Sequence, residues 1–464
     1  MLNAPIAPTW LVEQLTSPAN TNAAPTGFMN EGSRNSNLTS LAGFLRKTRG
    51  LDAERLFLAI NAVNSTAPNP LPESEVRNIA SSVANYPAGN AISLQDVPLS
   101  RYVAESIAVQ CRHVPEYGWM IWDGTRWAAD ITGLQTCELV KRRLEVLFEG
   151  INATCDMEYV NKARPLLSAG KVNAIMGLIA SDTTLRAGAV EFDAVDRVLN
   201  VTNGTLDLES MDLRRHEAKD LLTKVAKAKF DPAAACPHFD SLLARSLPEQ
   251  HRAFVLRLLG YALLEKPVEQ VFAMFVGAGA NGKSTLFNAV ANALGDYSAS
   301  VEPSSFIKQK NDRIRNDLAR LKGARLVGTS ELATGEILDA ALVKRFTGGD
   351  TITARALYKE LIEFKAEFVV VMTTNALPVI DGGDAALSRR IIIVPFRNVI
   401  PADEMDPQLP RVLEGEASGI LNRLLSGLAD YYQIGLAMPL DLTEEAAQFC
   451  VSSDMLSEFI QEEC

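Results

Sequence analysis

The stretch VFAMFVGAGANGKST, residues 271–285, constrains the fold more than any other part of the chain. Residues 271–276 are apolar and predict a buried strand, and the mostly apolar run 286–294 predicts a helix. The pattern G-x-x-x-x-G-K-S lies between them. Glycines there let backbone N–H groups turn toward phosphate oxygens, and the helix N-terminus adds partial positive charge. The order strand, glycine loop, helix therefore predicts a phosphate-binding site.

The side chains of this loop have distinct expected roles. Lys283 can reach the β- and γ-phosphates, and the hydroxyl group of Ser284 can bind Mg²⁺. The alternative is a chance glycine-rich turn, which the flanking strand and helix disfavour. The residues predicted to bind ATP are Gly277, Gly279, Asn281, Gly282, Lys283, Ser284 and Thr285.

Composition excludes several classes of protein. The 464 residues suffice for about three domains, and 47% hydrophobic with 22% charged residues is ordinary for a soluble globular chain. We find neither a signal peptide nor an apolar run of about 18 residues that would span a membrane. Six cysteines without a C-x-x-C pair suit a reducing cytoplasm. The net charge of −11 means that any contact with nucleic acid must come from a local basic surface.

The N-terminal part of the chain is predicted to be a linker followed by a helical domain. Residues 1–30 resemble a linker in composition, whereas residues 31–88 carry apolar residues at helical spacing and predict a small helical bundle. Its basic residues either touch nucleic acid or form a solvated polar face. These residues are Arg34, Arg46, Lys47 and Arg49.

Residues 97–265 give mixed signals. YGWMIWDGTRW at 117–127 predicts a hairpin that turns at Asp123-Gly124, and Asn203-Gly204 predicts a second hairpin turn. Helical stretches are expected from 137 to 179 and from 242 to 264. The tryptophans of the first hairpin favour core packing over base stacking.

The pattern Cys-x-His occurs twice in the sequence and suggests a possible metal site as one hypothesis. Cys111 with His113, and Cys236 with His238, could together supply four zinc ligands. Their spacing is unusual for zinc, so ordinary core or surface positions are favoured.

Three polar positions after the phosphate loop each lie at the end of a predicted strand. The strand 325–329 ends at Ser330-Glu331, a hairpin and strand over 351–373 lead to Asn375, and Arg389-Arg390 precede the apolar strand 391–394. An acid there can order Mg²⁺ and water, an amide can orient the attacking water, and an arginine can stabilise transition-state charge in a neighbouring subunit. Taken singly, each is more often a cap or a surface ion pair.

The order of these segments resembles a known family. GAGANGKST, RLVGTSE, LVKRFTGGDTITARALYKE, FVVVMTTN and SRRIIIVPF are similar to the superfamily 3 helicases, a branch of the AAA+ ATPases. The closer resemblance is to the phage, plasmid and poxvirus-type primase–helicases. It implies an α/β fold in which an AAA+ P-loop core, a parallel sheet flanked by helices, follows helical and α+β domains. The expected parts are an arm at 1–30, a primase C-terminal-type helical domain at 31–88, a helicase N-terminal domain at 97–255, the ATPase at 256–400 and a C-terminal helical segment at 401–464.

The resemblance assigns catalytic roles residue by residue. Lys283, Ser284 and Thr285 match the Walker A residues, Glu331 matches the Walker B acid, and Asn375 matches sensor 1. Magnesium is expected on Ser284 and Glu331. The Walker B strand of the wider superfamily often ends in two acids, but here Ser330 precedes Glu331. Metal ordering and water activation are therefore both assigned to Glu331, and the sequence does not divide these roles.

Other matches concern the neighbouring subunit and DNA. Arg389 or Arg390 matches the arginine finger, with Arg390 slightly favoured, and Lys344 is expected to reach nucleotide across the interface. Tyr358 and Lys359 match the pore hairpin that grips the DNA backbone. Arg355 nearby serves either phosphate binding or hairpin stability.

The resulting hypothesis is an ATP-driven, ring-forming DNA helicase of a phage or mobile element, acting in the bacterial cytoplasm. The resemblance implies a hexamer, 3′→5′ movement, single-stranded and forked DNA as partners, and a separate primase or polymerase, with no membrane. We expect that the chain alone makes no primers, because no cluster of metal-binding acids precedes residue 31. The helical pattern at the C-terminus stops where the family usually continues.

Two further hypotheses remain open. The first is a replication initiator or scaffold that binds DNA and uses ATP only to assemble. The second is a small-molecule kinase, which the hairpin and the arginine pair disfavour.

Overall fold

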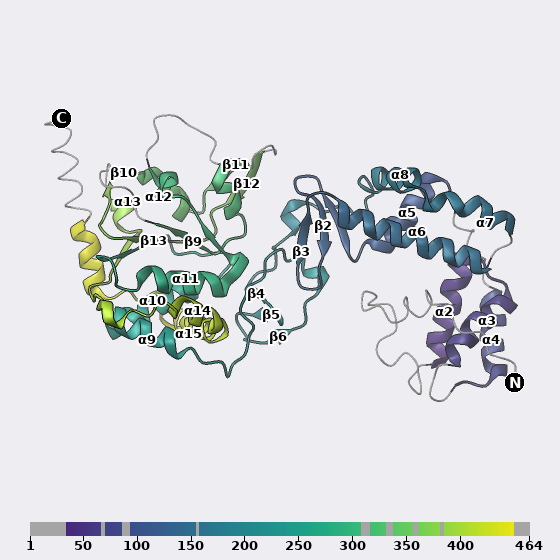
Figure 1. The fold of residues 1–464 in the computed structure, drawn as a ribbon, viewed down its shortest axis with the longest axis horizontal. Helices are drawn as coiled ribbons and strands as arrows, with labels where there is room; N and C mark the ends of the chain where they lie inside the picture. The colour runs from purple at the N-terminus through teal and green to yellow at the C-terminus, as the bar shows by residue number, and fades with distance from the viewer. Residues whose placement is uncertain are drawn as a thin grey trace. The chain divides into compact units, whose positions relative to one another are not determined.

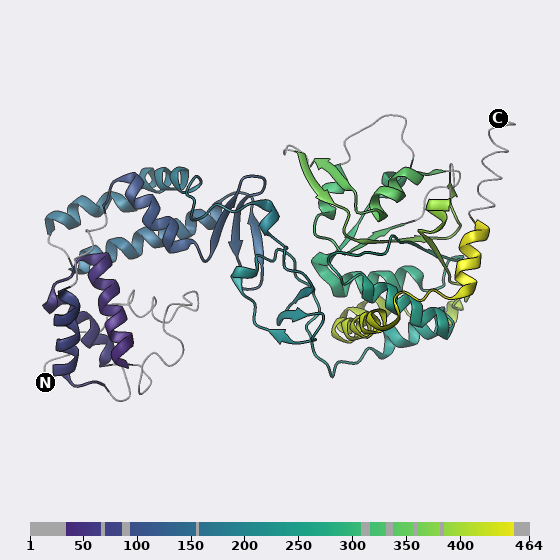
Figure 2. The same ribbon diagram turned by 180° about the vertical axis from the view of Figure 1, so that it is seen from behind.

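The computed structural model describes residues 34–65, 70–85, 93–154, 157–307, 316–330, 337–355, 361–380 and 385–449 (Figures 1 and 2). The chain forms two compact units. The first comprises Met1–Asp123 and Ala128–Ala189, and the second comprises Gly124–Trp127 and Val190–Cys464. Each unit is described by itself.

The first unit begins with the predicted helical bundle, made of α2 (Arg34–Arg49), α3 (Ala53–Asn64) and α4 (Glu73–Ala84). Asp52 caps α3 by accepting a hydrogen bond from the backbone of Arg55, as expected of an aspartate at that position. Buried aliphatic side chains fill the bundle; they include Leu38, Leu45, Leu56, Ile60 and Val76.

Of the four basic residues singled out in this bundle, Arg46 has a local structural role. Its guanidinium group donates hydrogen bonds to the carbonyl groups of Gly50 and Leu51, at 3.3 and 2.9 Å. These bonds satisfy carbonyl groups at the end of α2. The side chains of Arg34, Lys47 and Arg49 lie outside the part of the chain that the structure describes.

A small sheet, four further α-helices and one short 3₁₀ helix complete the first unit. Strand β1 (Cys111–Val114) pairs antiparallel with β2 (Gly118–Trp122), and β3 (Trp127–Asp130) is the third strand of the sheet. The predicted tryptophan hairpin therefore forms, and Trp127 is buried in agreement with a packing role. The helices are α5 (Asp96–Ile107), α6 (Leu134–Thr154), α7 (Met157–Ala163), the short η1 (Arg164–Leu167) and α8 (Ala169–Ile179).

The second unit opens with an antiparallel sheet of β4 (Val198–Val201), β5 (Gly204–Asp207) and β6 (Leu213–Arg214). The predicted turn at Asn203-Gly204 is wrong by one residue, because Val201 pairs with Gly204 and the turn is Thr202-Asn203. The side-chain amide of Asn203 pairs with the backbone of Phe230, and a Cβ on Gly204 would lie 2.4 Å from the carbonyl oxygen of Arg214. Gly204 is thus required by the close approach of β6.

The single helix predicted over 242–264 is also wrong. Two helices, α9 (Pro237–Ser246) and α10 (Glu249–Tyr261), are separated at Leu247-Pro248. Proline has no N–H to continue the helical ladder and disfavours helical geometry at the preceding residue, so Pro248 ends one helix and starts the next.

A five-stranded parallel sheet organises the rest of the second unit. Its order is β15 (Ile391–Pro395), β7 (Phe272–Val276), β13 (Val369–Thr374), β9 (Leu326–Thr329) and β8 (Ser298–Ser300). Every neighbouring pair is parallel, so all five carboxyl ends lie at one edge. This edge carries the phosphate loop.

Helices and a hairpin cover the two faces of this sheet (Figure 1). One core joins it to α9, α10, α11 (Lys283–Leu294), α14 (Leu409–Gly415) and α15 (Ala417–Ile434). The opposite core joins it to α12 (Ala340–Thr347), α13 (Ala385–Ser388) and the antiparallel hairpin of β11 (Thr351–Arg355) and β12 (Leu361–Lys365). The α/β fold class is therefore confirmed.

The remaining short elements are η2 (Ala189–Glu191), η3 (Ala218–Asp220), η4 (Gly295–Tyr297), η5 (Pro303–Phe306), η6 (Asn316–Leu321), η7 (Ala402–Glu404), β10 (Ile337–Leu338), β14 (Val379–Ile380) and a helix at 440–449.

Helices α10 and α15 cross at two glycines. A Cβ on Gly260 would lie 2.4 Å from the carbonyl oxygen of Leu424, and a Cβ on Gly427 would lie 2.0 Å from that of Leu256.

The predicted boundary after residue 255 falls inside α10, whose residues share one core with α15. Among the described residues, no helix has the length and apolar character to cross a membrane.

Candidate functional site

The phosphate loop follows β7 and leads into α11. Ala280 and Gly282 have left-handed backbone angles, with φ of 64° and 83°. Gly277 and Gly282 lie against other atoms: a Cβ on Gly277 would be 2.2 Å from Nδ2 of Asn281, and one on Gly282 would be 2.6 Å from Oγ of Ser246. Gly279, by contrast, is exposed and has open space at its Cβ position. The loop is therefore closely packed at both ends and open in the middle, which fits a phosphate group.

Lys283, the first residue of α11, is buried and points into this loop. Its ammonium nitrogen donates to the carbonyl oxygen of Gly277 and to Oδ1 of Asn375, both at 2.8 Å. It also lies 3.4 Å from Oδ1 of Asn281. Two of the predicted site residues, Lys283 and Asn375, are thus in direct contact.

The sheet register explains this contact. Thr374, the last residue of β13, pairs with Val276, the last residue of β7, so Asn375 follows directly beside Gly277. The N–H of Gly277 donates to the carbonyl group of Thr374 at 3.2 Å. Parallel strands that end together place the residues after them at one edge of the sheet.

The predicted magnesium ligands are described only in part. Ser284 is exposed in the first turn of α11 and Thr285 is half-buried. Ser330 follows β9, whose Thr329 pairs with Met372, so this strand also ends at the loop edge. Glu331 lies outside the described residues. Within the residues that the structure does describe, no three His, Cys, Asp or Glu side chains gather into a metal site.

The arginine pair lies at the other edge of the sheet. The carbonyl oxygen of Arg390 accepts a hydrogen bond from the N–H of Phe272, the first residue of β7. The five residues of β15 separate the pair from the loop edge, about 16 Å at roughly 3.3 Å per residue. Neither arginine is therefore placed beside Lys283 of its own chain.

The two arginines differ in their surroundings. Arg390 is half-buried, and its guanidinium group donates to the carbonyl oxygen of Ala386 at 2.6 Å and to Oε1 of Gln270. Arg389 is exposed. Lys344, in the last turn of α12, is half-buried. The guanidinium group of Arg390 is thus engaged within its own chain, whereas Arg389 presents an exposed side chain, and both remain candidates for the proposed arginine finger.

The predicted DNA-gripping hairpin forms as β11 and β12, with Thr351 opposite Lys365 and Arg355 opposite Leu361. One face of this hairpin packs into the core through Ile352, Ala354 and Phe364. Tyr358 and Lys359, which come between these strands in the sequence, lie outside the described residues, as does the side chain of Arg355.

The two cysteine–histidine pieces have ordinary surroundings. Cys111 is buried in the first unit, and burial raises the pKa of its thiol to about 12. Cys236 is buried in the second unit, and burial raises the pKa of its thiol to about 11. His238 bonds through Nδ1 to Glu416, 2.7 Å away. Among the described residues, no three metal-ligating side chains gather around either pair, so the structure gives no geometric support to the zinc hypothesis.

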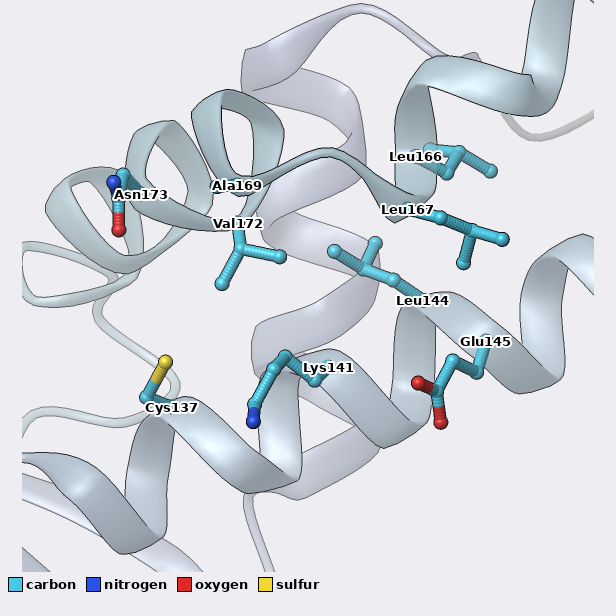
Figure 3. A pocket seen from close by; sticks show the side chains of 9 residues that line it. All are labelled: Cys137, Lys141, Leu144, Glu145, Leu166, Leu167, Ala169, Val172 and Asn173. Atoms are coloured by element: carbon cyan, nitrogen blue, oxygen red, sulfur yellow. The ribbon is translucent and has the colours of Figure 1, made fainter.

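A cavity of about 380 Å³ lies within the first unit, between α6 and the segment from η1 to α8 (Figure 3). Buried Leu144, Leu166 and Val172 line it, and Lys141 and Glu145 stand among its polar residues. The phosphate loop belongs to the second unit, so this cavity is separate from the candidate site.

One functional segment was missed from the sequence. The chain that leaves β15 runs along the phosphate loop, and the N–H of Ile400 donates to the carbonyl oxygen of Ala280 at 2.7 Å. No motif marks these residues, because their role is carried by backbone groups and by sheet order.

Comparison with known proteins adds to this geometry. The family described as D5 N terminal like matches residues 100–248, and Primase C terminal 1 (PriCT-1) matches residues 24–88. A family of unknown function (DUF5906) matches residues 275–390, which contain the phosphate loop. The chain therefore resembles primase–helicases over the regions that these two named domains match. The predicted resemblance to that family is confirmed.

Relatives of this chain occur in large DNA viruses. It is 27% identical over 58% of its length to a protein named a putative helicase in Acanthamoeba polyphaga mimivirus. It is 26% identical over 42% of its length to one named a putative helicase in Frog virus 3 (isolate Goorha), and 25% identical over 43% to one named a putative primase in African swine fever virus (isolate Tick/Malawi/Lil 20-1/1983). The chain spans 30%, 20% and 22% of these three relatives.

Among solved structures, the apo structure of the NrS-1 C terminal region is similar to 77% of the chain. The match covers 76% of that structure at 12% identity, with a TM-score of 0.48.

Proposed function

We propose that this chain is an ATP-dependent DNA helicase whose α/β domain is an AAA+ P-loop ATPase. The observation that carries the proposal is the position of the Lys283 ammonium group, between the phosphate loop and Asn375. A lysine held at the mouth of a glycine loop is placed to bind the phosphates of ATP. A side-chain amide beside it is placed to orient the attacking water.

The hydrolytic step draws on residues at the loop edge. The backbone N–H groups of the loop and the ammonium group of Lys283 hold the phosphates, and the Asn375 amide orients water toward the γ-phosphate. Ser284 and Glu331 are the proposed ligands of Mg²⁺, which when bound neutralises charge developing on the phosphate oxygens.

An arginine of a neighbouring subunit completes the proposed site. Arg389 and Arg390 lie at the far edge of their own sheet, so they can act on nucleotide only from another chain. This geometry supports a ring, for which we propose six subunits, with ATP at each interface. Lys344 then supplies further positive charge there.

The hairpin of β11 and β12 is the proposed DNA-moving element. Its strands are anchored in the core, and the sequence between them contains Tyr358 and Lys359. Because the chain has a net charge of −11, phosphate binding must depend on positive charge concentrated in the channel. We propose single-stranded and forked DNA as substrates, 3′→5′ movement, and a separate primase or polymerase as a partner in phage or mobile-element replication.

The deciding experiment combines ATP hydrolysis, with and without single-stranded DNA, and strand displacement on forked duplexes. We expect DNA to stimulate hydrolysis in the native chain, and Lys283→Ala to lose both activities. Lys227→Ala is a matched control, because that lysine bonds Asn292 away from the loop. If the native chain binds ATP and DNA but displaces no strand, the helicase proposal fails and the assembly hypothesis takes its place.

A further inference from the structure

We propose that Asn281 is a positioning residue, which fastens the phosphate loop to the segment leaving β15 and does not itself bind nucleotide. The proposal rests on the proposed ATPase function. It assigns to Asn281 a role different from the direct ATP contact expected from its place in the loop.

The amide group of Asn281 is committed inside the protein. Its side chain is 2% exposed, and Nδ2 donates to the carbonyl oxygens of Ala278 at 2.5 Å and Phe396 at 3.2 Å. A side-chain amide has two N–H donors, so both are used. The amide oxygen faces the ammonium group of Lys283 at 3.4 Å. Neither N–H of this amide is therefore left to donate to a bound nucleotide.

The partner segment, Phe396–Ile400, also bonds the backbone at two positions that precede Asn281. The N–H of Phe396 donates to the carbonyl oxygen of Val276 at 2.6 Å, and the N–H of Ile400 donates to that of Ala280 at 2.7 Å. The amide of Asn281 bonds this segment between those two points, 115 residues away in sequence. Three hydrogen bonds therefore fix the loop onto chain that enters the C-terminal helices.

Gly277 supplies independent geometric support. A Cβ at this position would lie 2.2 Å from Nδ2 of Asn281 and 2.3 Å from the carbonyl oxygen of Phe396. The first glycine of the loop thus provides the space in which the Asn281 amide meets Phe396. The amide then sets the path of residues 278–282, whose N–H groups are directed to phosphate.

Replacement by aspartate separates the two possible roles of Asn281. Both partners of Nδ2 are carbonyl oxygens, so Asn281→Asp would place a carboxylate against two acceptors. If Asn281 instead acts through its oxygen on metal or nucleotide, aspartate would preserve that contact and alanine would remove it.

The test measures the dissociation constant of Mg·ADP and the steady-state kinetics of ATP hydrolysis for the full chain. We expect the dissociation constant to rise about tenfold in Asn281→Ala and at least about thirtyfold in Asn281→Asp. KM for ATP should rise by a larger factor than kcat falls. Asn281→Ser, which keeps one donor, should lie between the native chain and Asn281→Ala. Asn292→Asp is the matched control, since Asn292 lies on α11 and bonds Lys227.

Thermal melting without nucleotide shows whether each variant folds, and the Asn281→Ser comparison remains available if Asn281→Asp does not. The inference is overturned if Asn281→Asp binds Mg·ADP as tightly as the native chain, or more tightly than Asn281→Ala. The inference is also overturned if Asn281→Ala and Asn281→Ser both bind Mg·ADP as tightly as the native chain. Failure of the native chain to bind Mg·ADP would instead remove the proposed function itself.

Discussion

The ammonium nitrogen of Lys283 lies 2.8 Å from the side-chain oxygen of Asn375, although the two residues are 92 positions apart. This bond joins the helix after the phosphate loop to the end of the neighbouring strand β13. A phosphate that binds Lys283 competes with Asn375 for the same ammonium group. Occupancy of the loop and the orientation of Asn375 are therefore linked.

Replacing Asn375 tests this link. Asn375→Ala removes the proposed water-orienting amide, and we expect kcat for ATP hydrolysis to fall about a hundredfold. Asn375→Asp would pair a carboxylate with Lys283 and compete with phosphate, so we expect a larger rise in KM than in the alanine variant. Steady-state kinetics of both variants, with Asn292→Ala as control, check these outcomes. Values within threefold of the native chain in both variants would contradict the assignment.

The roles of Arg389 and Arg390 should be distinguished by the stability of their alanine variants and by experiments that mix variant subunits. Arg390→Ala loses bonds to Ala386 and Gln270, so we expect the free energy of unfolding to fall by about 1–3 kcal/mol. Arg389→Ala, at an exposed position, should change it by less than about 0.5 kcal/mol but abolish most hydrolysis. Mixing Arg389→Ala chains with Lys283→Ala chains should restore part of the activity, because some interfaces then hold both native residues. Absence of recovery would exclude action across the interface.

Lys359, which comes between the two hairpin strands in the sequence, is expected to contact the DNA backbone. Lys359→Ala should weaken binding of single-stranded DNA of any sequence. It should also reduce the slope of log affinity against log salt concentration by about 0.7, the value for one phosphate contact. Fluorescence anisotropy over a salt series measures both quantities. Lys219→Ala, which removes an exposed lysine paired with Glu217, is the control; equal slopes in the two variants would contradict the contact.

Glu265 should make the stability of the second unit pH-dependent. Burial raises the pKa of this carboxyl group to about 7, against a smaller opposing effect of Arg325. The folded chain therefore binds more protons than the unfolded chain between about pH 4.5 and 7, and stability falls as pH rises through this range. The full shift corresponds to about 3 kcal/mol, which solvent screening of the partly exposed group reduces to about 1–2 kcal/mol. Glu265→Gln should remove this loss of stability. Denaturant unfolding of the native chain and of this variant at pH 5 and 8 measures the effect. If both proteins show the same pH dependence, the assignment is wrong.

The crossing of α10 and α15 depends on Gly427. Gly427→Ala would bring a Cβ to 2.0 Å from the carbonyl oxygen of Leu256, so the helices must separate. We expect the free energy of unfolding to fall by about 2–4 kcal/mol. Gly415→Ala in α14 meets no atom within 4 Å and should be neutral or slightly stabilising. Thermal melting of both variants checks this contrast, and equal stability would contradict the close crossing.

Local sequence signals predicted the elements that carry the candidate site. The glycine loop between an apolar strand and a helix, the hairpin after 351 and the short apolar strands before Ser330, Asn375 and Pro395 all form where expected. Such signals succeed because side-chain period and turn chemistry act over a few neighbouring residues. The break at Pro248 was also readable locally, but the apolar spacing on both sides concealed it.

The sequence by itself therefore predicted a phosphate loop between a strand and a helix and determined in what order the strands occur. Only the tertiary structure decided that Asn375 meets Lys283, that Arg390 is bonded within its own chain, and that the Asn281 amide faces Phe396. Each of these contacts except that of Arg390 with Ala386 joins residues far apart in the chain. They follow from strand order and register, which are set by packing of the whole domain and leave no local pattern in the sequence.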